Sequence, residues 1–239
     1  MRLIKAHAFW ELRLTLRNGE QLLLTLIIPL ALLLGLNATG IFAAGDSLTP
    51  VDSAFSVVCM VSLIATCFTS LAIGTGFERR SGALTFLATT PLGRQGLVMG
   101  KVLATVLLAS ISVALVTVLA VILGWRPSLG ALWAIPTLLI AGAAFATWAL
   151  VIASVFRAEA VLAIANALFL LLVVVGGASA SVISLPLEAL VAVVPSAALG
   201  DALRSSLGAS HAPQWWTLVI LAIWAAVGYA IARKRFSWQ

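Results

Sequence analysis

Charged residues are scarce in this chain of 239 residues, at 9%, whereas apolar residues make up 62%. Soluble domains carry charge on about a quarter of their residues, so most of this chain is not expected to face water. Lipid is the solvent that fits such a composition, which predicts an integral membrane protein. The net charge of +6 could suggest nucleic acid, but the basic residues are placed for a membrane surface, and no nucleic-acid partner is expected.

Patterns for catalysis and metal binding are also missing from the sequence. Cys59 and Cys67 form no C-x-x-C pair and are expected to be small apolar residues of a helix. There is no H-E-x-x-H pair and no G-x-S-x-G elbow. Residues 96–101, GLVMGK, lack the first glycine and the final hydroxyl of a phosphate loop; Gly96 and Gly100 instead permit close helix approach. We therefore expect no enzyme activity, metal or cofactor in this chain.

Six apolar runs are long enough to cross a bilayer as helices, which takes about 20 residues each. An all-α fold is expected, because lipid cannot satisfy open backbone groups. The first run is longer than the apolar core of a cleaved signal peptide, so we interpret it as a retained span. Within a single transmembrane domain of residues 1–239, the predicted spans are 21–44, 53–77, 97–124, 131–156, 160–183 and 214–232.

The basic residues predict the orientation, because cytoplasmic loops are enriched in Lys and Arg. If the N-terminus lies in the cytoplasm, all but two of the 14 basic residues, Arg126 and Arg204, fall on the inner side. Both termini, including the tail 233–239, are therefore predicted to be cytoplasmic in a multi-pass protein of the cell membrane.

Residues 1–20 are basic and contain aromatic side chains. Their four basic residues fall on one side of a helical wheel, which favours an interfacial (elbow) helix on an anionic leaflet over a simple basic tail.

Residues 184–213, between the last two spans, are semi-apolar. Pro186 and Pro195 divide them into pieces too short to span, which favours two short re-entrant helices at the outer face over an ordinary surface loop.

The predicted spans contain polar but no charged side chains at mid-membrane depth. Proton pumps and ion-coupled transporters usually need such charges, so any energy source is expected outside this chain. Hydroxyl and amide groups within spans commonly join helices, and they can also line a path for cargo. The candidates for such a path are Thr66, Thr69, Ser70 and Asn166.

Residues 78–94, ERRSGALTFLATTPLGR, connect the second and third spans, and we call them the corner. Residues 83–88 are predicted to form a short helix with an apolar face that includes Leu84, Phe86 and Leu87. Thr90 and Pro91 suit the N-cap and first position of the next helix. A rigid, partly apolar corner is suited to docking on a soluble protein, and the alternative is a simple connecting loop.

The corner resembles a signature of ABC type-2 transporter permeases, E-R-x-x-G-[TA]-L-x-x-L-x-x-T-P-L-x-R…G-K. The matching residues are Glu78, Arg79, Gly82, Ala83, Leu84, Leu87, Thr90, Pro91, Leu92, Arg94, Gly100 and Lys101. The layout of the whole chain is most similar to small drug-exporter permeases of the daunorubicin-resistance type. Thr85 departs from the pattern, because the family often has Glu there.

This resemblance implies a permease that is driven by a separate ATPase. Two permease subunits, identical or paralogous, would form the path for an amphipathic or lipophilic cargo, and two ATP-binding subunits would hold ATP and Mg²⁺. The corner would be a coupling helix, with a second contact at the turn after the fourth span. The implied contact residues are Glu78, Arg79, Arg80, Gly82, Leu84, Leu87, Thr90, Pro91, Arg157 and Glu159.

Two alternatives stay open. A haem exporter or a lipid-linked glycan exporter has the same fold with another cargo. An intramembrane enzyme or a passive structural protein would be of another class, but the sequence holds no cluster of catalytic residues or metal ligands that would support an enzyme.

Overall fold

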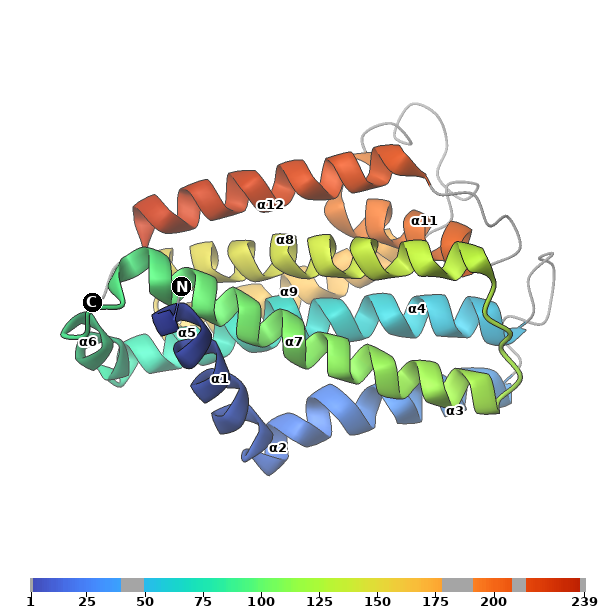
Figure 1. Ribbon diagram of the computed structural model, residues 1–239, viewed down its shortest axis with the longest axis horizontal. Helices are drawn as coiled ribbons and strands as arrows, with labels where there is room; N and C mark the ends of the chain where they lie inside the picture. The colour runs from blue at the N-terminus through green and yellow to red at the C-terminus, as the bar shows by residue number, and fades with distance from the viewer. Residues whose placement is uncertain (1, 40–49, 178–190, 208–213, 237–239) are drawn as a thin grey trace.

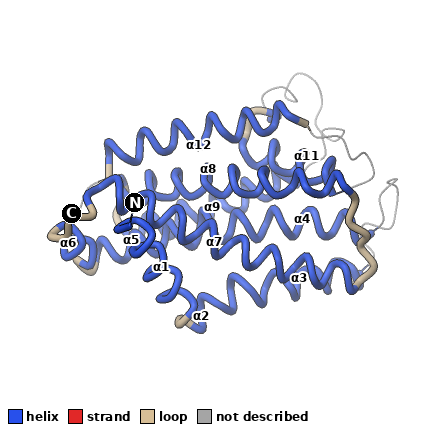
Figure 2. Tube along the Cα trace, in the orientation of Figure 1, coloured by secondary structure: helices blue, strands red, loops and turns tan. Residues whose placement is uncertain are grey.

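A computed structural model describes residues 2–39, 50–177, 191–207 and 214–236 (Figure 1). Every regular element in these ranges is helical, and Figure 2 shows no strand among them. The predicted all-α fold is therefore confirmed for the described part of the chain.

Successive helices run back and forth along the long axis of the molecule (Figure 1). In chain order they are α1 (Arg2–Leu16), α2 (Gly19–Leu22), the π-helical η1 (Leu23–Ile27), α3 (Ile28–Thr39), α4 (Pro50–Ile64), the π-helical η2 (Ala65–Ser70), α5 (Leu71–Arg80), α6 (Ala83–Ala88), α7 (Gly93–Ile122), the 3₁₀ helix η3 (Leu129–Trp133), α8 (Ala134–Val155), α9 (Ala158–Gly177), α11 (Pro195–Leu207) and α12 (Trp215–Arg235).

Within the described ranges, 5 helical segments are long and apolar enough to cross a membrane. They correspond to the second to sixth predicted spans: Pro50–Arg80, Gly93–Ile122, Leu129–Val155, Ala158–Gly177 and Trp215–Arg235. The first predicted span contains a shorter apolar helix, Leu23–Thr39, and its last residues, 40–44, lie outside the described residues.

Helix α8 lies at the centre of the bundle, in contact with α4, α5, α7, α11 and α12. Its buried positions are rich in small residues, such as Ala141, Gly142 and Ala149. Small side chains let helices approach closely, which matters in lipid because there is little hydrophobic driving force between helices. The indole N–H of Trp148 in α8 donates to the carbonyl of Trp224 in α12 at 3.1 Å and fixes the register of this pair.

Helix α11 excludes an ordinary surface loop for residues 195–207 of the segment 184–213. It begins at Pro195, one of the two prolines that divide this segment, and most of its residues are buried against α4, α8, α9 and α12. Residues 195–207 are therefore a packed helix and not an ordinary surface loop. Residues 184–190 and 208–213 of the same predicted segment lie outside the described residues.

Helix α1 confirms a helix within residues 1–20 and packs along α7. Gly100 of α7 makes this contact possible, because a Cβ at that position would overlap the ring of His7. The close approach expected at Gly100 is thus used to seat α1.

A glycine contact between α9 and α11 provides a test of the packing. Gly200 lies against the carbonyl of Gly176, and a Cβ at position 200 would overlap that oxygen. Because a backbone carbonyl cannot swing aside, Gly200→Ala is expected to lower the free energy of unfolding by roughly 1–3 kcal/mol. Gly177→Ala is the matched control, since the space around it is open. Thermal unfolding in nanodiscs measures both variants, and equal melting temperatures would contradict the packing.

Candidate functional site

The corner turns the chain from α5 into α6 and then into α7. Gly82, which precedes α6, has a φ of 78°, in the left-handed region that only glycine adopts at little cost. The hydroxyl of Ser81 donates to the carbonyl of Glu78 at 3.0 Å and closes the end of α5. The glycine of the family pattern is therefore needed for the reversal of the chain.

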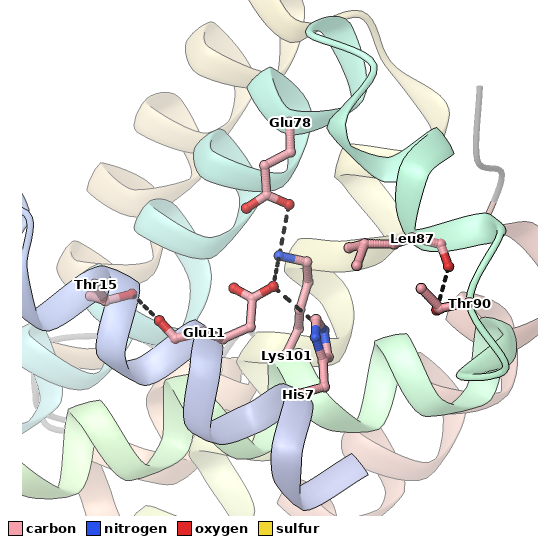
Figure 3. Close-up of polar contacts among 7 residues, drawn as sticks. All are labelled: His7, Glu11, Thr15, Glu78, Leu87, Thr90 and Lys101. Carbon is pink, nitrogen blue, oxygen red and sulfur yellow. Dashed lines mark hydrogen bonds and ion pairs between the residues drawn. The ribbon is translucent and has the colours of Figure 1, made fainter. Parts of the chain in front are cut away.

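Thr90 closes α6 and does not open α7. Its hydroxyl donates to the carbonyl of Leu87 at 2.6 Å (Figure 3). Helix α7 begins only at Gly93, with Leu92 in the N-cap position. The prediction that Thr90 and Pro91 cap and start the third span is wrong, because Pro91 lies in an exposed turn before that helix.

The two sides of α6 differ in exposure. Leu84 is 0% exposed and packs in a cluster with Leu97, Val98, Leu150, Ala232 and Phe236. Phe86 is 78% exposed. The side of α6 that is open to a partner thus carries Phe86, whereas Leu84 anchors the corner to the bundle. Leu87, the other predicted apolar contact, packs partly against the same cluster.

Arg79 joins α5 to the end of α8. Its guanidinium donates to the carbonyls of Ala153 at 2.9 Å and Phe156 at 2.8 Å. These carbonyls lie near the C-terminus of α8, where helix carbonyls lack partners within the helix. Arg79 therefore acts as a cap that holds two helices together beside the corner.

Arg80 joins α5 to the start of α9 through an ion pair with Glu159. The side chains are 61% and 64% exposed, so this pair contributes little to stability. Arg157 is exposed on the same short turn. The structure thus places the second predicted contact, Arg157 and Glu159, directly beside the corner.

Lys101 is buried where α1, α5 and α7 meet (Figure 3). Its ammonium lies 2.7 Å from Oε2 of Glu78 in α5 and 2.9 Å from Oε1 of Glu11 in α1, and its side chain is 1% exposed. We call these three residues the Lys101 cluster. An unpaired buried charge costs several kcal/mol, so neither α1 nor α5 can move away from α7 without a penalty.

His7 lies at the α1 side of the Lys101 cluster. Its Nε2 is 3.4 Å from Oε1 of Glu11, and its ring fills the space left by Gly100. Burial lowers the pKa of the His7 imidazole; Glu11 opposes this shift and Lys101 adds to it. The imidazole is therefore neutral at pH 7.

The candidate path residues do not gather at one place. Thr66 and Ser70 in η2 line a cavity of about 60 Å³ next to the Lys101 cluster, where Ser70 accepts a hydrogen bond from Gln21 at 2.9 Å. Thr69, also in η2, is not among the residues that line this cavity. Asn166 lies on the exposed side of α9 and donates to a carbonyl of its own helix.

Sequence reasoning missed the partners of Lys101. Glu11 is the one acidic residue in α1, and an acid among basic residues on a helix is a signal that could have suggested a buried partner.

Among the described residues, no group of three His, Cys, Asp or Glu side chains is placed to hold a metal ion. Cys59 and Cys67 are buried free thiols.

Removal of the buried ammonium tests the Lys101 cluster. Lys101→Met keeps the apolar stem but leaves two carboxylates unpaired, and we expect a loss of up to roughly 3–5 kcal/mol in the free energy of unfolding. Adding Glu11→Gln and Glu78→Gln to this variant should recover a large part of the loss. Lys5→Met, at an exposed position of α1, is the control. A Lys101→Met protein that unfolds at the same denaturant concentration as the control would show that the cluster does not hold the helices.

Comparison with known proteins identifies the family of the chain. Residues 35–234 match the family model described as "ABC-2 family transporter protein", and a comparison with curated proteins found no match. The matched range includes the corner, Lys101, the described helices from α4 to α11, and α12 up to residue 234. The chain therefore belongs to the ABC-2 transporter family, whose members are membrane permeases of ABC transporters.

Proposed function

We propose that the protein is the membrane subunit of an ATP-driven exporter and moves an amphipathic or lipophilic cargo. ABC-2 membrane subunits work in general with ABC ATPase partners. The main support for an ATPase partner is the structure of the corner. The exposed Phe86 lies on a short helix that Leu84 and Arg79 fix to the bundle. A partner that presses on Phe86 moves α5 and α7 together, since rigid packed elements transmit such displacements.

The proposed layout has six spans, with α2, η1 and α3 forming the first. Figure 1 supports it, because the start of α1, the end of α12 and α6 lie at the same end of the bundle. That end carries most of the basic residues, which the positive-inside rule assigns to the cytoplasm. Helix α1 would lie on the inner leaflet as the elbow helix. Two such permeases and two ATP-binding subunits, which supply ATP and Mg²⁺, would form the complete exporter.

An apolar groove supports a lipophilic cargo. It lies between α4, α7 and α8 and has a volume of about 360 Å³, in the range of pockets for drug-sized molecules. The hydroxyls of Ser110 and Thr117 donate to carbonyls of their own helix at 2.8 and 2.7 Å, so they offer no free donor. The groove contains no His or Met that could ligate haem iron, which favours this cargo class over haem.

The exposed side of α6 can be tested in a complex with the ATP-binding subunit. Phe86→Asp is expected to reduce cargo transport per ATP hydrolysed at least tenfold, because it places a charge in the proposed contact. Its melting temperature should be unchanged, since the side chain is exposed. Leu129→Asp is the control, as Leu129 is also exposed but lies at the opposite end of the bundle. Equal coupling in the two variants would contradict the docking role.

The groove can be tested by filling it. Ala114→Phe adds a ring inside the groove and is expected to lower transport of a lipophilic dye at least several-fold, with ATP hydrolysis in the absence of cargo unchanged. Leu115→Phe is the control, because the next residue of α7 is exposed and does not line the groove. The groove is not part of the path if both variants transport the dye equally.

A further inference from the structure

The cavity next to the Lys101 cluster is small and polar. Its volume of about 60 Å³ leaves room for a few water-sized ligands, since each needs roughly 10–15 Å³. Residues of α1, α2, η2, α5 and α7 line it, and among them are all three members of the Lys101 cluster and the hydroxyl-bearing Thr66, Ser70 and Thr75.

Two of these hydroxyls have no partner. Thr66 and Thr75 are each 1% exposed, and neither Oγ1 has a hydrogen-bond partner in the protein. A buried hydroxyl left unsatisfied costs roughly 1–3 kcal/mol, so native proteins place a ligand or water beside such groups. Thr66 also lies in the π-helical η2, and π-helical turns are frequent at functional sites.

The carboxylates provide a second, independent feature of the cavity. Lys101 contacts one oxygen of Glu78, Oε2, and one of Glu11, Oε1. Figure 3 shows the second oxygen of each carboxylate on the same side of Lys101. In the form in which both carboxylates are ionised and His7 is neutral, the ammonium and the two carboxylates carry a formal charge of −1.

The neighbouring arginines do not balance this charge. Arg79 and Arg80 follow Glu78 directly in α5, but both have other partners. Arg79 donates to the carbonyl of Ala153 in α8 and to that of Phe156, the residue after α8. Arg80 pairs with Glu159 of α9. The charged groups that face Glu78 are Lys101 from α7 and Glu11 from α1. Glu11 and Glu78 are only partly exposed, at 21% and 35%, so water screens their charge incompletely and a counter-charge beside them is favourable.

We propose that this cavity binds one monovalent positive charge, a proton or an alkali metal ion, at the second carboxylate oxygens of Glu11 and Glu78 and the hydroxyls of Thr66 and Thr75. Carboxylate and hydroxyl oxygens suit hard cations, and a single positive charge neutralises the group. Because Glu78 also binds Lys101, the occupant alters the electrostatic attachment of α5 to α7 directly behind the corner.

Thermal unfolding of the purified permease in nanodiscs tests this site without the ATPase, so its outcome is separate from that of the proposed function. N-methylglucamine chloride is replaced by NaCl or KCl at constant ionic strength, at several pH values. An alkali ion in the site raises the melting temperature saturably with Na⁺ or K⁺. A proton in the site gives a melting temperature that depends on pH but not on the alkali ion.

In either case, Glu78→Gln is expected to remove the dependence. Glu159→Gln, the same change at an exposed glutamate, should retain it. The proposal is overturned if Glu78→Gln responds to salt and pH as the unmodified protein does.

A second test applies if Glu78→Gln does not fold. Thr75→Val, alone and together with Thr66→Val, removes proposed ligands of the cation and keeps every charge. If the site is occupied, these variants should melt at a lower temperature than the unmodified protein. If the occupant is an alkali ion, the salt concentration that gives half of the stabilisation should also rise at least tenfold. An empty cavity predicts the opposite, because removal of an unsatisfied hydroxyl is stabilising. A higher melting temperature in every salt and at every pH would therefore refute the proposal.

Discussion

A single buried ammonium, shared by two carboxylates from separate helices, holds the functional end of this protein together. Lys101 belongs to α7, Glu78 to α5 and Glu11 to α1, so one side chain joins three elements. The cost of leaving the buried ammonium without its carboxylates is large compared with the cost of breaking an exposed pair. Helices in lipid have little hydrophobic reason to stay together, which makes this interaction more important than it would be in a soluble protein.

The corner depends on this attachment. Helix α6 has six residues and is too short to be stable by itself, so its position comes from its anchors. Leu84 is inserted into the bundle, Arg79 caps α8, and the Lys101 cluster fixes the two helices that flank α6. Phe86 is then presented outward on a firm support.

The sequence was sufficient for features that depend on local chemistry. Of the six spans predicted from the lengths of the apolar runs, five are helical segments long and apolar enough to cross a membrane in the described part of the chain. Features that depend on packing could not be predicted. The contact of Glu11 with Lys101 joins residues 90 positions apart, and no local pattern encodes it. A six-residue apolar helix does not reveal which side faces the bundle, so Leu84 and Phe86 could not be distinguished. Thr90 fits an N-cap by residue type, but its hydroxyl is used by the preceding helix.

The central claim is that this permease moves cargo only when a separate ATPase acts on the corner. Transport in proteoliposomes tests it most directly, with the permease alone, with the ATP-binding subunit, and with both the subunit and ATP. The account predicts net cargo movement against a gradient only in the third case. Equal movement by the permease alone would contradict it.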